Sequence, residues 1–293
     1  MNLLKKFGDV KVFWGADHSQ LEIRVLAQMS KDPLLIQLIQ SGEDIHSSVG
    51  HVLTGVSIEK IKKDRETRTA IKGIHFGIIY GLSPASLYYT LKTAAAERKE
   101  EFKMSEAQVT HLYNRYFQKF RRVKYFIDKM MKFGEQKGYV ETLFGFRREI
   151  SIAGSEDRST YWKNQAVNSP IQGTAHQLIL MSMALMELKK KTYHLLNDLC
   201  MEVHDSLIGF GNLRDLPEIY KQVKYLLEVD TMKYVKAYWP ELNWSVPLKA
   251  EAKAGLRLGV MCEYAGEPAE EFIEKWCEEN HKFEKKLAED MAA

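Results

Sequence analysis

Four residues spaced four apart, Arg68, Lys72, Phe76 and Tyr80, combine two cations with two aromatic rings in a stretch without proline. At 3.6 residues per helical turn, a step of four rotates each side chain only slightly past the previous one, so the four form a stripe about 18 Å long. Cations at one end of such a stripe suit a polyphosphate, and rings at the other end suit a base or a sugar. An amphipathic helix with a solvated basic end accounts for the same spacing, and the stripe alone does not separate the two interpretations.

Two acids, Asp17 and Asp205, each follow an apolar stretch that predicts a buried strand. Lys11–Asp17 ends on the first acid, and the runs Leu199–Val203 and Leu207–Phe210 flank a polar turn that contains the second. A shared sheet would bring the two carboxylates together, and a divalent cation such as Mg²⁺ would relieve their repulsion. Two such ions about 4 Å apart can activate a hydroxyl and stabilise a leaving phosphate. Ordinary turn or cap acids are the alternative interpretation, because they are common at strand ends.

Composition and length favour a globular protein with room for two lobes. The chain has 293 residues and a net charge of +3, with 45% hydrophobic and 28% charged residues. Its three cysteines (Cys200, Cys262 and Cys277) have no CxxC spacing, which argues against a disulfide framework or a zinc site. The N-terminal lysines do not suit a signal peptide, and polar residues interrupt the most apolar region, Ile171–Leu188, so we expect no membrane span.

Charge is distributed unevenly along the chain. Residues 115–148 contain ten Lys or Arg against three Asp or Glu, which predicts a polyanion partner, with a solvated face as the alternative. Residues 263–293 contain ten acids against four lysines. This acidic end predicts either a docking segment or a solvated helix.

The remaining pattern predicts an α+β fold, with a few strands as a platform and a helical lobe between Ser30 and about Leu188. We expect helices over 19–29, 33–39, 105–137 with a break near Phe120, 158–191 disturbed near Pro170 and Gly173, and 216–238. We expect a hairpin over 139–150 and a strand over 246–254. The charged interval Lys92–Lys103 predicts an insertion or a mobile loop.

Three motifs together resemble the polymerase motifs of family A DNA polymerases, the bacterial polymerase I group. They are Asp17-His18-Ser19-Gln20-Leu21-Glu22-Ile23-Arg24, the stretch Arg68-x3-Lys72-x3-Phe76-Gly77-x2-Tyr80-Gly81, and Val203-His204-Asp205. Shorter matches at 44–46, 138–145, 168–174 and 246–248 keep the family's order, so the resemblance extends from about residue 10 to 259. It implies a palm-type antiparallel sheet with a helical fingers subdomain. The expected domains are palm over 1–30, fingers over 31–165, palm over 166–264 and an acidic C-terminal extension over 265–293.

The resemblance also implies roles for individual residues. The ligands of two Mg²⁺ ions would be Asp17, Asp205 and the backbone carbonyl of His18. The nucleotide-binding residues would be Arg68, Lys72, Phe76, Tyr80, His46, Glu22 and Gln20, and Lys72 is also a candidate proton donor to the departing pyrophosphate. The DNA-binding residues would be Arg24, Asn168, Gln172 and His204, with a structural role as the alternative for these four. Glu22 would crowd the 2′ carbon of the sugar and so exclude ribonucleotides.

The implied function is template-directed DNA synthesis, in which deoxynucleotides are added to a primer 3′-hydroxyl, with DNA replication and repair both open as its task. The partners would be primer-template DNA and deoxynucleoside triphosphates, in the cytoplasm of a bacterial or phage-infected cell, with an organelle left open. Because the first metal ligand is already residue 17, we expect the thumb and exonuclease domains to be absent. We therefore expect a split polymerase, in which a second chain supplies the thumb, the rest of the palm and, as an option, an exonuclease.

Two other functions stay open at this point. One is a non-catalytic DNA-binding or structural subunit of a replication complex. The other is a relative of the single-subunit RNA polymerases, although Gln20 and Glu22 in the first motif argue against it.

Three residues depart from the family's usual pattern. Ser206 stands where a glutamate usually follows the histidine and aspartate, which removes one carboxylate from the metal site. Thr69 replaces a frequent second arginine beside Arg68, and His75 replaces a usual asparagine before Phe76.

Overall fold

The computed structural model describes residues 9–151, 159–193 and 197–292 of the chain. The chain divides into two compact units. We call them the sheet unit (Met1–Leu21, His176–Glu241 and Leu248–Ala293) and the helical unit (Glu22–Ala175 and Leu242–Pro247). Within the described residues, no helix combines the length and the apolar character that spanning a bilayer requires.

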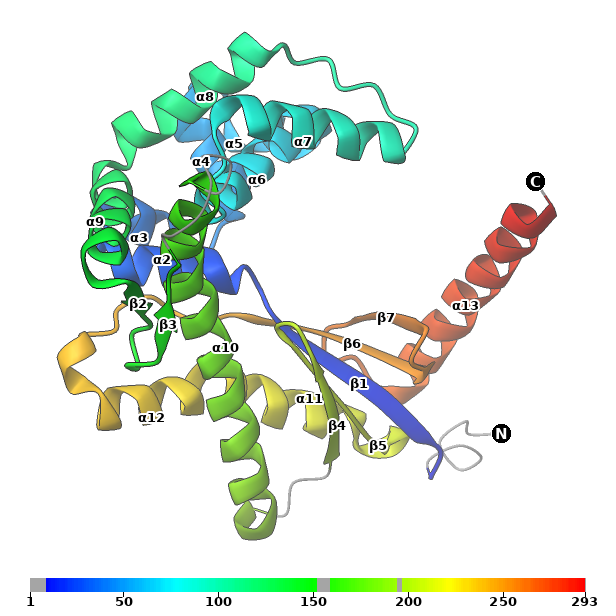
Figure 1. The fold of residues 1–293 in the computed structure, drawn as a ribbon. Coiled ribbons are helices and arrows are strands. Elements are labelled where there is room, and N and C mark those ends of the chain that lie inside the picture. Colours follow the sequence, from blue (N-terminus) through cyan, green and yellow to red (C-terminus); the bar gives the residue numbers. More distant parts are fainter. Residues whose placement is uncertain (1–8, 152–158, 194–196, 293) are drawn as a thin grey trace. The chain divides into compact units, whose positions relative to one another are not determined.

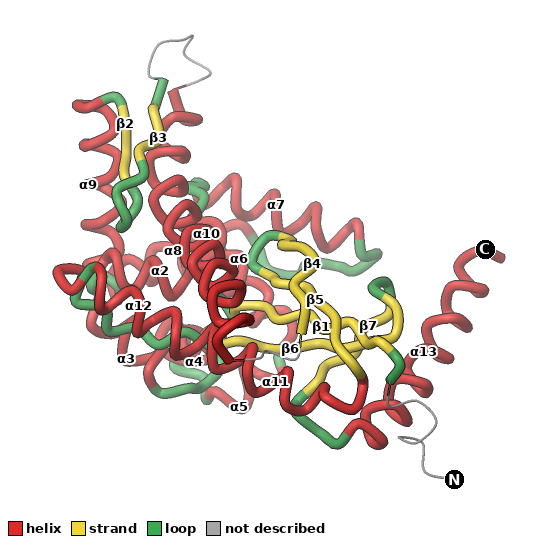
Figure 2. The backbone as a smooth tube through the Cα atoms, turned by 90° about the horizontal axis from the view of Figure 1, so that it is seen from below, coloured by secondary structure: helices red, strands yellow, loops and turns green. Residues whose placement is uncertain are grey.

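The sheet unit is built around a five-stranded sheet in the order β4-β5-β1-β6-β7, in which all paired neighbours are antiparallel (Figures 1 and 2). Its strands are β1 (Lys11–His18), β4 (Asn197–Val203), β5 (Ser206–Asn212), β6 (Ala250–Arg257) and β7 (Val260–Tyr264). The central strand β1 pairs with β5 on one side and β6 on the other, although these segments lie about 190 and 240 residues further along the chain. The predicted α+β fold with an antiparallel sheet is confirmed.

One face of the sheet is covered by α11 (Leu216–Tyr225), which packs against β1, β5 and β6. Alternate residues of β1 are buried, among them Val12, Trp14 and Ala16, as expected for a strand with one covered face. Trp14 lies opposite Gly209 of β5, where any Cβ would approach the indole ring to 2.3 Å, so only glycine leaves room for the tryptophan.

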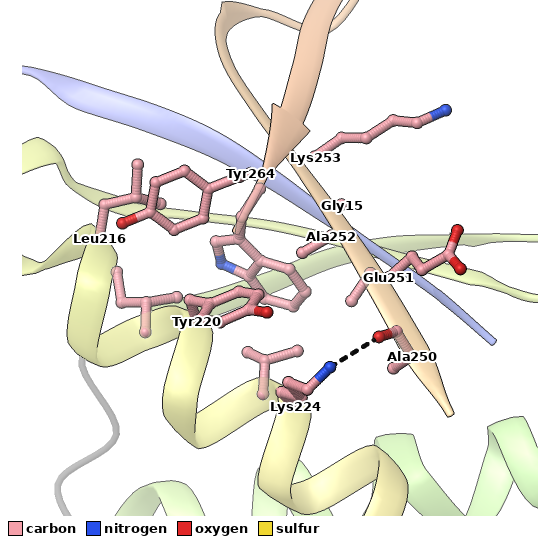
Figure 3. Close-up of a pocket in the computed structure, with 13 residues that line it drawn as sticks. Gly15, Leu216, Tyr220, Lys224, Ala250, Glu251, Ala252, Lys253 and Tyr264 are labelled. Carbon is pink, nitrogen blue, oxygen red and sulfur yellow. Dashed lines mark hydrogen bonds between the residues drawn. The ribbon is translucent and has the colours of Figure 1, made fainter. Parts of the chain in front are cut away.

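The space between α11 and the sheet is a packed core rather than a ligand site. Its cavity of about 10 Å³ has room for no more than about one water molecule. At its rim, Lys224 of α11 donates a hydrogen bond of 3.1 Å to the carbonyl of Ala250 (Figure 3). Helix α11 therefore packs on this side of the sheet and leaves no room for a ligand.

Further helical segments lie in the described part of the sheet unit. A π-helical turn (Leu226–Asp230) joins α11 to α12 (Thr231–Tyr238), so the helix predicted over 216–238 is present but interrupted. The acidic end forms α13 (Ala269–Ala292), which packs against β7. Phe272 is fully buried and the indole of Trp276 donates to the carbonyl of Val260, so the first turns of α13 belong to the core rather than to a wholly solvated helix.

The helical unit contains most of the helices. They are α2 (Leu21–Ser30), α3 (Pro33–Gln40), α4 (Ile45–Thr54), α5 (Ile58–Lys63), α6 (Arg65–Ile79), α7 (Pro84–Glu97), α8 (Glu106–Lys119) and α9 (Arg121–Lys137). A hairpin of β2 (Tyr139–Glu141) and β3 (Arg147–Glu149) follows, as predicted. The break predicted near Phe120 is confirmed, because this fully buried residue separates α8 from α9.

Helices α6 and α7 pack closely because α6 carries glycine where the two meet. Asp64 caps α6 by accepting the Thr67 N–H at 3.1 Å, and Ser83 caps α7 in front of Pro84. A Cβ on Gly73 would lie 2.5 Å from Leu91 Cδ2, so its absence lets α7 approach α6. Because of this packing, residues of α6 and α7 lie close enough to line one groove.

Three secondary-structure predictions are wrong in detail. The first half of the interval Lys92–Lys103 is helical rather than a loop, because α7 continues to Glu97 with Leu91 and Ala95 buried. Helix α10 (Ser159–Tyr193) continues through Pro170 and Gly173, since the buried packing of this segment outweighs the one hydrogen bond that proline cannot donate. The strand predicted over 246–254 begins only at Ala250.

Candidate active site

Asp17 lies near the end of β1, between two polar neighbours on the adjacent strands. The register pairs it with Ser206 of β5 on one side and with Glu251 of β6 on the other. Cross-strand partners point to the same face of a sheet, so Ser206 and Glu251 flank Asp17. The Ser206 hydroxyl donates a hydrogen bond of 2.8 Å to Asp17 Oδ1, and the Ser19 hydroxyl donates one of 3.0 Å to Glu251 Oε1.

Asp205 lies in the two-residue turn that joins β4 to β5. Val203 and Ser206 pair across this turn, and His204 takes a left-handed conformation with φ of 58°. The backbone N–H of His18 donates to the carbonyl of Asp205 at 3.3 Å, which ties the turn to the end of β1. The register and this hydrogen bond therefore bring the two acidic residues to one end of the sheet.

This end of the sheet offers oxygen ligands of the kind that Mg²⁺ prefers. The carboxylates of Asp17 and Asp205 and the carbonyl of His18 are hard donors from neighbouring segments, so the donor set fits a hard divalent cation. In the part of the chain that the structure describes, no group of three or more His, Cys, Asp or Glu side chains is arranged to hold a metal ion. A metal site here would therefore depend on the carboxylates of Asp17 and Asp205. The Asp17 carboxylate also accepts a hydrogen bond from the Ser206 hydroxyl.

In the helical unit, the predicted stripe follows one side of α6 and ends at Tyr80, the C-cap of this helix. Arg68, Lys72, Phe76 and Tyr80 all line an open groove of about 830 Å³, whose other wall includes residues of α7. Phe76 is 41% exposed and Tyr80 is 40% exposed, so the rings are accessible rather than part of an aromatic core. Lys72 Nζ lies 5.8 Å from the centre of the Phe76 ring. The structure therefore brings these four predicted residues together.

Arg68 is held by an acid at the start of a neighbouring helix. Its Nη2 and Nε lie 3.0 and 3.2 Å from the two carboxylate oxygens of Asp44, which also caps α4 through the N–H and hydroxyl of Ser47. Although burial acts in the opposite direction, these hydrogen bonds lower the pKa of Asp44 from 3.8 to about 2. Asp44 thus fixes the guanidinium at the edge of the groove.

His46, predicted to help with the triphosphate, is buried and does not line the groove. Its Nδ1 lies 2.9 Å from Nδ1 of His75, so one ring donates and the other accepts, and the two must hold complementary tautomers. Burial lowers the pKa of His46 to about 4, and burial together with His46 lowers the pKa of His75. Both rings are therefore neutral at pH 7, and a direct phosphate contact by His46 stays a prediction.

Glu22 and Tyr80 interact electrostatically within the helical unit. Burial raises the pKa of Glu22 in the first turn of α2. Burial and then the charge of Glu22 raise the pKa of the Tyr80 phenol. Glu22, which we expect to select the sugar, therefore lies near Tyr80 at the aromatic end of the stripe. Gln20, with φ of 56°, lies in the turn between β1 and α2.

The predicted DNA-binding residues have different environments. Arg24 is buried and its Nη1 donates a hydrogen bond of 2.7 Å to the carbonyl of Pro247, which supports a structural role. Asn168 and Gln172 lie one turn apart on α10, the first half-buried and the second exposed. His204 is exposed at the tip of the β4–β5 hairpin. A contact of these four residues with DNA stays a prediction.

Sequence reasoning missed four charged residues near these sites. Glu251 escaped notice because only the strand register reveals that it lies beside Asp17. Lys62, Arg65 and Arg98 line the same groove as the stripe, but they come from α5, the first turn of α6 and the end of α7. The spacing of basic residues in the sequence does not reveal that these three side chains line one groove, because they come from different helices or helix ends.

Comparisons with known proteins give a consistent result. Residues 5–259 match the model of the family described as DNA polymerase family A. A DNA polymerase of Bacillus phage SP01 is 34% identical over 291 residues, which are 97% of this chain and 30% of the phage protein. DNA polymerase I of Chloroflexus aurantiacus is 37% identical over 198 residues, which are 67% of this chain and 20% of that protein.

A solved structure supports the same relationship. The polymerase domain of Pol1 from M. smegmatis, in complex with DNA primer-template and dNTP, superposes with a TM-score of 0.68 and 26% sequence identity, over 85% of this chain and 40% of that one. The chain spans 30% or less of the length of these two curated relatives. The phage alignment extends beyond the family match into the acidic C-terminal stretch.

Proposed function

Because the chain belongs to DNA polymerase family A, we propose that it is the catalytic palm and fingers part of a template-directed DNA polymerase. It would add deoxynucleotides to the 3′-hydroxyl of a primer. The observation that carries this proposal is the sheet register, in which Asp17 pairs with the first residue after the turn that contains Asp205. The accessible stripe along α6 supports it independently.

Asp17, Asp205 and the carbonyl of His18 would hold two Mg²⁺ ions. When bound, these ions would lower the pKa of the primer hydroxyl and stabilise the charge that develops on the phosphates. The Ser206 hydroxyl supports the role of Asp17, because its hydrogen bond restrains that carboxylate. Ser206 contributes no charge of its own, so the site would bind metal less tightly than one with three carboxylates.

The stripe would hold the incoming nucleotide. Arg68 and Lys72 would bind the triphosphate, and Lys72 would donate a proton to the departing pyrophosphate. Phe76 and Tyr80 would pack on the sugar and the base, since both rings are accessible. Glu22 would exclude a ribose 2′-hydroxyl, which would crowd its half-buried carboxylate.

DNA would be bound by the residues predicted for that role. The M. smegmatis relative was solved with primer-template, which supports DNA as the partner here. Gln172 is exposed on α10, and its amide could donate to the minor-groove acceptors that recur in every base pair. The dependence on a second chain that supplies the thumb, more of the palm and, as an option, an exonuclease stays part of the proposal.

One observation favours a second function. Ser206 in place of the usual glutamate would suit a non-catalytic DNA-binding subunit of a replication complex. The hydrogen bond from Ser206 to Asp17 argues against such a loss, because it holds the Asp17 carboxylate at the end of β1.

Primer extension distinguishes these functions. The chain, alone and with any protein that co-purifies with it from its source, is incubated with primer-template, Mg²⁺ and deoxynucleoside triphosphates. A polymerase extends the primer, and Asp205→Asn abolishes extension while leaving DNA binding intact. A complex that binds DNA but never extends the primer would support the non-catalytic subunit.

A further inference from the structure

The groove beside α6 contains more cations than the stripe supplies. In addition to Arg68 and Lys72, it is lined by Lys62, Arg65 and Arg98. Arg98 is the C-cap of α7. All five basic residues belong to the helical unit, so they form one cationic lining.

Two of these arginines share one acid. Arg65 Nη2 lies 2.7 Å from Glu100 Oε1, and Arg98 Nε lies 3.0 Å from Glu100 Oε2. The carboxylate therefore bridges two guanidinium groups, as a phosphate does in an arginine-rich anion site. The Arg65 side chain is 77% exposed and that of Arg98 is 46% exposed, so both pairs are accessible to a competing anion.

The backbone that carries Arg98 and Glu100 is held in a defined position. The N–H of Glu100 donates to the carbonyl of Ala95 at 2.9 Å, at the end of α7. Glu66 in the first turn of α6 accepts the N–H groups of Lys103 and Met104 at 2.6 and 2.8 Å. These hydrogen bonds hold the segment that follows α7 against the first turn of α6. None of them uses the Glu100 side chain.

We propose that Arg98 and Arg65 form an additional binding position in this groove for the terminal phosphates of a nucleoside triphosphate, and that these phosphates displace Glu100. This inference rests on the proposed polymerase function and deepens it. Arg98 supplies a guanidinium to this groove from the end of α7. The groove volume of about 830 Å³ is ample for a nucleotide.

The displacement follows from charge. A terminal phosphate carries more negative charge than a carboxylate and has three oxygens, so it can pair with both guanidinium groups and release Glu100. Exposed ion pairs of the Glu100 type are weak, which keeps the exchange reversible. Arg98 and Glu100 should therefore have opposite effects on affinity, because one binds the phosphate and the other competes with it.

Calorimetric titration of the full chain with inorganic tripolyphosphate in the presence of Mg²⁺ tests the proposal. Arg98→Ala should weaken binding about fivefold, and Glu100→Gln should strengthen it about threefold, as expected for exposed single-charge contacts. Arg98→Lys should lie between Arg98→Ala and the unmodified chain, because it keeps the charge without the planar fork. Circular dichroism and urea denaturation establish that each variant is folded.

The exposed pair of Arg147 and Glu141, 2.5 Å apart on the β2–β3 hairpin and outside the groove, supplies the controls. Arg147→Ala and Glu141→Gln should leave tripolyphosphate affinity unchanged. If Glu100→Gln weakens binding, the Glu100 carboxylate only stabilises the segment after α7, and the proposal that phosphate displaces it is wrong.

Lys72→Ala separates this inference from the proposed function. If Lys72→Ala weakens binding but both Arg98 variants do not, the additional phosphate position is wrong and the role of the stripe stands. If neither Lys72→Ala nor Arg98→Ala changes the affinity, the groove does not bind polyphosphate and both assignments are wrong.

Discussion

Replacing Asp44 by asparagine tests how the helical unit fixes Arg68. Asparagine keeps a cap for α4, because its amide oxygen can still accept the N–H of Ser47. It removes the negative charge that faces the Arg68 guanidinium at 3.0 Å. The change therefore isolates the charge contribution from the capping hydrogen bond.

The magnitude follows from the pKa of Asp44, which is about 2 instead of 3.8. That difference corresponds to an upper limit of about 2.4 kcal/mol at pH 7. The Asp44 side chain is 22% exposed and that of Arg68 is 42% exposed, so solvent screens the pair. We expect Asp44→Asn to lower the free energy of unfolding by about 1–2 kcal/mol at pH 7.

The lowered pKa of Asp44 also determines how its contribution to stability changes with pH. Because the folded pKa of Asp44 is depressed, its contribution is complete above the unfolded value of 3.8 and is lost as pH falls through about 2. The difference between Asp44→Asn and the unmodified chain, measured by urea denaturation, should therefore be roughly halved at about pH 3.

Asp64 provides a matched control. It caps α6 through the N–H and hydroxyl of Thr67, as Asp44 caps α4, but no arginine pairs with it among the described residues. Asp64→Asn should therefore cost less than Asp44→Asn. Equal losses in the two variants, or a loss at Asp44 that does not change with pH, would refute the argument that Arg68 is held by charge.

Three further predictions concern the helical unit and its ligands. Glu22→Ala should raise incorporation of ribonucleotides relative to deoxynucleotides at least tenfold, as loss of a clash with the 2′-hydroxyl implies, and an unchanged ratio would remove the exclusion argument. Phe76→Tyr should increase the use of dideoxynucleotides, as the assigned contact of this ring with the sugar implies; single-nucleotide incorporation rates would measure the change, and no change would count against that contact. The pKa of His46 is lowered by burial to about 4 from 6.5, so the unmodified chain should lose stability as pH falls between these values, and His46→Asn should flatten that part of the stability curve.

The sequence predicts the elements that local spacing defines, and misses what tertiary contacts decide. The break between α8 and α9 and the β2–β3 hairpin follow from local chemistry, because Phe120 interrupts the pattern and Gly145 permits a turn with φ of 83°. Strand β7 has five residues and no clear alternation, so its only strong signal is its pairing with β6. The interval after Leu91 looks like a loop because its charges dominate, whereas the buried Ala95 keeps it helical as far as Glu97.

The residues of the candidate sites also fall into two groups, those that local spacing predicts and those that only tertiary contacts bring together. Spacing along one helix predicts that Arg68, Lys72, Phe76 and Tyr80 share a face, and they do. The pairing of His46 with His75 joins residues 29 apart on different helices, and no periodicity reveals it. Glu251 and Arg98 likewise reach their sites through strand register and helix packing.

The central claim is that Asp17 and Asp205 serve nucleotide addition to a primer. Its most direct test is extension of a labelled primer on a template with Mg²⁺ and the four deoxynucleoside triphosphates, by the chain together with any protein that co-purifies with it. We expect template-dependent extension that Asp17→Asn and Asp205→Asn each abolish while DNA binding persists. Extension that continues unchanged in either variant, or DNA binding without any extension by the intact complex, would contradict the account.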